Sequence, residues 1–197
     1  DDVAVEDSLY TVGRRGVAGT VFVHKIAGAL AEKGASLEEV KAVAQKTIKN
    51  VKSIGFAFTS CTVPAKGTPT FVLEEDMMEF GVGIHGEPGI AKEKIVSADE
   101  LAVKMIGKIL NEGIYNENDE IALMINGLGG TAMQELYLLN NSVSKVLEEK
   151  KIRIYKTFVG NYMTSLEMAG ASVTLLKLDE ELKELLGAKA DTSAMKI

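Results

Sequence analysis

The residue best suited to do chemistry in this sequence is His85, one of only two histidines in 197 residues. It lies in the segment Glu79–Ile90, EFGVGIHGEPGI, between several glycines. Glycines permit backbone angles closed to other residues and let a small ligand approach the main chain. A neutral imidazole can accept a proton or attack an electrophilic carbonyl, and Glu87 could orient it or lie at the rim. The pattern indicates either a nucleophile or base at His85, or a tight turn that contains a histidine.

Other chemistries find less support in the sequence. His85-Gly-Glu87-Pro resembles the opening of the zinc deaminase motif, but the C-x-x-C that completes that site is missing. Zinc takes three or four protein ligands, and the single Cys61 and the distant His24 supply few. No G-x-S-x-G of a serine hydrolase occurs. We therefore expect no metal site, a structural His24 inside a helix, and a buried Cys61.

Two further segments could bind an anion. GRRGVAGT places Arg14 and Arg15 just before a predicted helix, where guanidinium and backbone N–H groups could meet a phosphate. NGLGGT, residues 126–131, is a glycine-rich link between a strand and a helix, without a Walker lysine or G-x-G-x-x-G spacing. Tight structural connections are the favoured interpretation of both. The acidic residues 74–79 are expected to form a solvated loop or edge.

The elements that must position these residues alternate along the chain. Apolar periodicity predicts helices at 16–33, from 37 onward, at 97–111 and at 131–150, and a short helix ending at Gly187. Strands are predicted at 53–61, 78–84, 120–126, 152–160 and 172–179. Three helices should open with capping boxes: Ser36 with Glu39, Ser97 with Glu100, and Thr131 with Gln134.

This order of elements predicts the fold class and where His85 lies in it. Two predicted strands are separated only by the loop near Pro64–Pro69, so the order is not strictly βαβ. We expect an α/β domain with a mixed sheet covered by helices. The strand at 78–84 would deliver His85 to its carboxyl end, where open α/β sheets tend to bind ligands.

Composition excludes several classes of protein. Hydrophobic residues make up 46% and charged residues 25%, as in ordinary globular domains. A net charge of −6 and the absence of Trp argue against nucleic-acid binding. No apolar run approaches the roughly 18 residues of a membrane helix, and one cysteine suits a reducing cytoplasm.

Five segments together resemble the substrate-binding subunit of dihydroxyacetone kinases, in the same order and over nearly the whole chain. They are DDVAVEDSLYTVGRRGVAGTV, CTVPAKGTPTF, MEFGVGIHGEPGI, NGLGGTAMQELY and MTSLEMAGASVTLLKLD. The resemblance implies that residues 1–197 are the second, C-terminal domain of that subunit, a two-layer mixed sheet. The first domain, which in the family supplies an aspartate and a second histidine for acid-base roles, would be absent from this chain. The start at Asp1 without Met agrees with a cut chain, which we expect to be inactive alone.

The resemblance also implies a role for His85. It would bind dihydroxyacetone covalently, as a hemiaminal between a ring nitrogen and the carbonyl carbon, for phosphorylation to dihydroxyacetone phosphate in glycerol metabolism. No cofactor or metal is implied on this chain. ADP or ATP is expected on a helical partner subunit, recharged in the bacterial form by the phosphoenolpyruvate phosphotransferase system, and a cytoplasmic homodimer is expected. A dihydroxyacetone-sensing transcriptional coactivator with the same histidine is the alternative.

Overall fold

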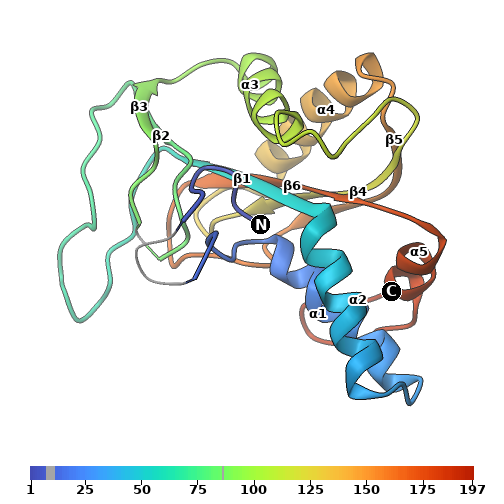
Figure 1. Ribbon diagram of the computed structural model, residues 1–197. Helices are drawn as coiled ribbons and strands as arrows, with labels where there is room; N and C mark the ends of the chain where they lie inside the picture. The colour runs from blue at the N-terminus through green and yellow to red at the C-terminus, as the bar shows by residue number, and fades with distance from the viewer. Residues whose placement is uncertain (8–11, 86) are drawn as a thin grey trace.

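The computed structural model describes residues 1–7, 12–85 and 87–197. A six-stranded sheet with the order β3-β2-β1-β6-β4-β5 forms its centre (Figure 1). The strands are β1 (Val51–Ala57), β2 (Met77–Phe80), β3 (Ala91–Lys94), β4 (Glu120–Gly127), β5 (Arg153–Gly160) and β6 (Gly170–Lys177). The helices are α1 (Gly19–Glu32), α2 (Leu37–Asn50), α3 (Ala98–Leu110), α4 (Met133–Glu149) and α5 (Glu180–Gly187).

The sheet is mixed, as predicted. Strands β4 and β5 pair in parallel, whereas β6 pairs antiparallel with both β1 and β4. Since β1 and β4 are both antiparallel to β6, they run in the same direction and their carboxyl ends lie at the same end of the sheet. The long loop 58–76 extends from that end in Figure 1.

Helices cover both faces of the sheet. Helices α3 and α4 pack on one face, and α1, α2 and α5 lie on the other (Figure 1). Strand β4 explains this arrangement, because all of Ile121–Ile125 are fully buried and no face of the strand is left for water. The α/β fold with a mixed sheet is confirmed, and the sheet is the middle of three layers rather than one of two.

Helix starts follow the capping boxes in two of three cases. Ser36 and Ser97 each accept from the backbone N–H three residues on, so the predicted starts of α2 and α3 are confirmed. The third prediction is wrong, because α4 begins at Met133. The Thr131 hydroxyl instead donates to Gly170 O at 2.6 Å and accepts from Gly170 N at 2.8 Å. A contact to β6 has replaced the local cap.

The strands around His85 also differ from the prediction. Strand β2 ends at Phe80 rather than Ile84, because Gly81 has φ +75° and turns the chain out of the strand. Strand β3 was not predicted; its four residues, Ala91–Lys94, are exposed or half-buried at the sheet edge and carry charges that discourage further pairing. None of the described helices has the length and apolarity needed to cross a membrane.

Candidate functional site

His85 lies on a loop between β2 and β3, five residues beyond the end of β2 rather than directly at it. The loop is closed at its base, where Ile90 N donates to Phe80 O at 2.8 Å. Gly83 N donates to Glu87 O at 3.3 Å and closes it again nearer the tip. The His85 side chain is 74% exposed. The imidazole thus projects into solvent from a loop that is closed by its own backbone hydrogen bonds.

Strand β1 supports this loop from beneath. Gly81 N donates to Gly55 O at 2.7 Å. A Cβ at Gly55 would lie 3.0 Å from Val82 O, so the strand presents bare backbone where the loop crosses it. The start of the loop that carries His85 is therefore held close to β1 at Gly81 and Val82.

Glu87 holds His85 through two contacts. Its Oε2 accepts from His85 N at 2.8 Å, and its Oε1 lies 3.1 Å from His85 Nδ1. A Cβ at Gly83 would lie 2.5 Å from Glu87 Oε2, so a glycine there leaves room for the carboxylate. Glu87 therefore orients His85, one of the two roles that the sequence left open for it.

The pKa of Glu87 lies below its ordinary value. Burial acts to raise the pKa, but hydrogen bonds from the backbone N–H groups of Glu87 and His85 and from the His85 ring outweigh it. An ionised carboxylate only accepts hydrogen bonds, so a neutral ring that is hydrogen-bonded to it has its proton on Nδ1. Nε2 is then left with a free lone pair, which suits it to act as a nucleophile or base.

Several segments with candidate residues meet beside this loop. Val17 follows the arginines, Val82 and Ile84 belong to the His85 loop, and Leu128 lies in the NGLGGT segment. These residues share one apolar cluster on the α1 side of the sheet: Val17, Ala57, Cys61, Val82, Ile84, Leu128 and Met168. Cys61 is 2% exposed, which confirms its prediction as a buried residue. Tertiary packing has brought together segments that are far apart in the sequence.

Comparison with known proteins identifies the family. Residues 1–194 match the Dak1 domain. The chain belongs to the Dak1 domain family. It is 50% identical over 195 residues to the "PTS-dependent dihydroxyacetone kinase 1, dihydroxyacetone-binding subunit DhaK" of Listeria innocua, with 98% of this chain and 59% of the relative covered. It is 40% identical over 219 residues to the corresponding PEP-dependent subunit of Escherichia coli, with 99% of this chain and 62% of the relative covered.

A solved structure agrees with this assignment. The "Dihydroxyacetone kinase operon co-activator Dha-DhaQ" superimposes with a TM-score of 0.88 at 34% identity, covering 98% of this chain and 60% of the other. This Dak1 domain therefore spans about 60% of the length of each of these three proteins.

The two arginines of the GRRGVAGT segment are engaged in ion pairs. Arg14 contacts Glu112 through both terminal nitrogens, at 3.1 and 3.0 Å. Arg15 is buried against Asp2, with Nη2 2.9 Å from Oδ2. Both guanidinium groups have carboxylate partners within the chain, which supports the structural interpretation over an anion site.

The backbone of the NGLGGT segment is likewise used within the Dak1 domain. Leu128 N donates to Gly170 O at 3.1 Å, and Gly130 N donates to Met168 O at 3.0 Å. These N–H groups bind the segment that leads into β6 and so are not directed at a ligand. The favoured reading of this glycine loop as a tight connection is supported.

The prediction that residues 74–79 are solvated is wrong for Glu79. Glu74 and Glu75 are exposed as expected, but Glu79 is only 4% exposed, so the prediction of a solvated segment is wrong at its end. Glu79 Oε1 accepts from Gly89 N at 2.8 Å and fastens the far side of the His85 loop. Alternation with buried Met78 and Phe80 in β2 places Glu79 on the opposite face of the sheet and by itself would indicate an exposed side chain, so no local signal predicts this burial.

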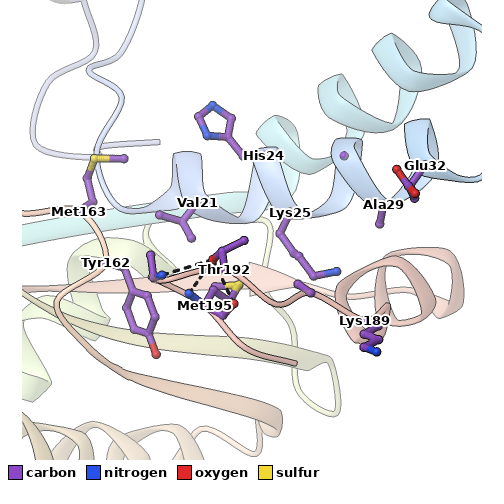
Figure 2. A pocket seen from close by; sticks show the side chains of 13 residues that line it. Val21, His24, Lys25, Ala29, Glu32, Tyr162, Met163, Lys189, Thr192 and Met195 are labelled. Atoms are coloured by element: carbon purple, nitrogen blue, oxygen red, sulfur yellow. Dashed lines mark hydrogen bonds between the residues drawn. The ribbon is translucent and has the colours of Figure 1, made fainter.

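A separate groove of about 630 Å³ lies between α1 and the C-terminal segment 189–195 (Figure 2). His24 is on α1, as predicted, and lines this groove together with Lys25 and Tyr162. None of the lining residues belongs to the His85 loop. Across residues 1–7, 12–85 and 87–197, no group of three or more His, Cys, Asp or Glu side chains is arranged to hold a metal ion.

Proposed function

We propose that this Dak1 domain binds dihydroxyacetone through a covalent bond from His85 Nε2 to the carbonyl carbon. The observation that carries the proposal is the contact of Nδ1 with the Glu87 carboxylate, 3.1 Å away, because a neutral ring that donates from Nδ1 keeps a lone pair on the exposed Nε2. The substrate is suggested by the relatives, whose names describe dihydroxyacetone-binding subunits.

The proposed step balances within the site. The Nε2 lone pair forms a bond to the carbonyl carbon, and the π electrons of the C=O bond move to oxygen, which takes up a proton. The ring becomes cationic and returns to neutrality by releasing its Nδ1 proton. Glu87 stabilises the cation and can accept that proton before it passes to solvent. The product is a hemiaminal with no net change in charge.

A covalent bond fits the size of this ligand. A three-carbon ketone offers few atoms for non-covalent affinity, so a reversible bond would supply both binding and selection. Glycerol has hydroxyl groups but no carbonyl carbon for Nε2 to attack. It would be rejected by reactivity rather than by shape.

In the kinase that we propose, the bound ketose receives a phosphoryl group on a terminal hydroxyl and leaves as dihydroxyacetone phosphate. The donor would be ADP-linked, on a helical partner subunit recharged through the phosphoenolpyruvate phosphotransferase system, so this chain would hold no cofactor. Residues 1–197 would be the C-terminal domain of a cytoplasmic, homodimeric subunit whose first domain supplies the acid-base residues. Measurable kinase activity from residues 1–197 with the partners supplied would contradict this division of labour.

The proposal is tested by NMR with dihydroxyacetone labelled with ¹³C at its carbonyl carbon, added to the full-length protein. We expect the ketone signal of the bound ligand to be replaced by that of a tetrahedral carbon. His85→Ala should abolish the new signal. Retention of the ketone signal on the bound ligand, or an adduct that survives His85→Ala, would overturn the proposal.

The second histidine provides a matched control. His24 is exposed on α1 and far in sequence from the His85 loop, so His24→Ala should leave the adduct unchanged. Loss of the signal in both variants would point to a general effect of removing histidine rather than to a nucleophile at position 85.

A coactivator that senses dihydroxyacetone is the second candidate. It is favoured by the TM-score of 0.88 with the operon co-activator. Both candidates predict the same adduct, so only turnover separates them. Conversion of the labelled ketose to its phosphate in the presence of a phosphoryl-carrying partner subunit would establish the kinase. Adduct formation without turnover would favour the coactivator.

A further inference from the structure

Arg15 reaches the His85 loop from a different part of the chain. It precedes α1, yet its Nη2 donates to Gly81 O at 2.7 Å and its Nη1 to Pro88 O at 3.3 Å. Gly81 is where the chain leaves β2, and Pro88 lies three residues beyond His85. One guanidinium group therefore joins the two sides of the loop that carries the imidazole.

Asp2 fixes this guanidinium group in turn. Its Oδ2 accepts from Arg15 Nε at 3.0 Å and lies 2.9 Å from Nη2. The two side chains are 7% and 1% exposed. Burial raises the pKa of Asp2, an effect that the Arg15 charge and hydrogen bonds from Ala4 and Arg15 oppose.

The arrangement uses properties that belong to arginine. Its planar fork presents five N–H donors in fixed directions, and here three nitrogens serve a carboxylate and two carbonyls. A buried ion pair is weak evidence for stability, because desolvation of both charges offsets their attraction. The ion pair does, however, fix the direction of the guanidinium donors that bind the two carbonyl groups of the loop.

We propose that Arg15 is a positioning residue for His85, acting through the carbonyl groups of Gly81 and Pro88. The proposal rests on the proposed function of His85 as a nucleophile. The hydrogen bonds of Arg15 to the loop are made to the carbonyl groups of Gly81 and Pro88, so its effect on the imidazole passes through the backbone of the loop. We call these two hydrogen bonds of Arg15 the clamp. Without the clamp His85 remains a nucleophile, but the placement of Nε2 relative to a bound ketone is no longer fixed.

The test compares Arg15→Lys, Arg15→Gln and Arg14→Gln in the full-length protein by titration with the ¹³C-labelled ketone. Lysine keeps the charge but lacks the planar fork whose separate nitrogens reach the two carbonyls. A misplacement of about 1 Å can cost a hundredfold in a positioned reaction. We expect the dissociation constant of the adduct to rise at least about tenfold in both Arg15 variants. Arg14→Gln should match the wild type, because Arg14 pairs with Glu112 and not with the loop.

A second readout separates positioning from a loss of stability. In ¹⁵N-histidine-labelled protein, the Nδ1–H signal of His85 should broaden or shift in the Arg15 variants. Val143→Ala, a buried residue of α4 on the other face of the sheet, is the control for stability alone. At a matched thermal midpoint it should leave both the signal and the affinity unchanged.

A buried arginine can be needed for folding, so a double variant completes the test. Arg15→Met with Asp2→Asn leaves no unpaired charge in the core but still removes the clamp, and we expect the same weak adduct. Wild-type affinity in a folded Arg15 variant or in the double variant would overturn the proposal, as would an equal loss in Val143→Ala. Absence of any adduct in the wild type would instead contradict the proposed function.

Discussion

At the scale of single residues, the chemistry that we propose for this Dak1 domain depends on the partner of His85. The sequence singled out His85, but a histidine between glycines is equally compatible with a simple turn. The contact of Glu87 Oε1 with Nδ1 at 3.1 Å supports the proposed nucleophile, because in the neutral ring it favours the tautomer that exposes an Nε2 lone pair. Glu87 was visible in the sequence, two residues further on, but its direction was not.

Replacement of Glu87 tests this selection. Glu87→Gln keeps the shape of the side chain but removes the charge that stabilises a cationic ring. Hydrogen bonds to charged groups contribute about 1.5–3 kcal/mol, so the adduct should weaken by roughly ten- to a hundredfold. The ¹³C titration described above measures it. Glu75→Gln, at an exposed position, is the control, and equal affinities in the two variants would contradict a role for Glu87.

At the scale of elements, His85 is held by the close approach of a loop to a strand. The loop turns out of β2 at Gly81, crosses over Gly55 of β1 and returns to pair at Ile90. Each contact is between backbones, so the position of the imidazole depends on how closely strand and loop can approach. A side chain at the crossing point would separate them.

Gly55→Ala introduces such a side chain. Its Cβ would lie 3.0 Å from Val82 O, so the loop must move by a few tenths of an ångström. Overpacking of this kind costs about 1–3 kcal/mol of unfolding free energy. Urea denaturation measures the loss, and weaker ketone binding should accompany it.

Gly107→Ala is the matched control for this substitution. Gly107 lies within α3, with nothing within 4 Å of its added Cβ. Alanine should therefore stabilise the protein by about 0.5–1 kcal/mol. If the two variants changed stability in the same direction, the crossing at Gly55 would not be a close contact in solution.

Helix α5 provides a prediction about pH. Asp179 caps it by accepting from Leu182 N at 2.9 Å and also pairs with Lys46. Burial acts to raise the pKa of Asp179, but the hydrogen bonds from Lys46 and Leu182 lower it overall. A carboxyl group whose pKa is lowered by folding stabilises the protein above its unfolded pKa of about 3.9 and loses this effect as the pH falls through the folded value.

Asp179→Ala should therefore cost about 1 kcal/mol at pH 7, the usual contribution of a cap. The difference from wild type should shrink as the pH falls from about 4 through the lower pKa of folded Asp179, because the wild type then loses the charge as well. Thermal unfolding at a series of pH values measures it. Asp191→Ala, at an exposed pair with Lys196, should show little effect at any pH, and a constant cost for Asp179→Ala would contradict the role of the charge.

At the scale of the whole molecule, the sheet is a partition between two cores. Leu123 and Met124 are neighbours in β4 and fully buried, yet Leu123 packs in the α3–α4 layer and Met124 in the layer of α1, α2 and α5. A sheet covered on one face only would have left one of them in water. The stability of the chain thus depends on both layers.

Truncation on the two faces tests the three-layer arrangement. Leu123→Ala and Met124→Ala should each lower the free energy of unfolding by about 2–5 kcal/mol, because each leaves a cavity in a packed core. Urea denaturation measures both. Val103→Ala, 58% exposed on α3, should change stability by no more than about 0.5 kcal/mol. A small loss for either buried residue would contradict a sheet buried on both faces.

The sequence by itself determined most of the elements and singled out His85 as the residue that we propose to react. Apolar periodicity gave all five helices and five of the six strands, and local spacing gave the caps at Ser36 and Ser97, because these signals act within one or two turns of chain. It did not give β3, whose half-exposed charged residues lack a periodic apolar pattern and become a strand only by pairing with β2.

Only the tertiary structure decided what surrounds His85. Glu79 lies at the end of an acidic run, yet it is buried. Thr131 forms hydrogen bonds to β6 instead of capping α4. The partners of both side chains lie outside their own local segments. Arg15 approaches the loop from 66 residues away, where no local pattern can indicate which carbonyl a guanidinium will meet. Local signals specify which residues can react, whereas the contacts that orient them form only when distant segments pack together.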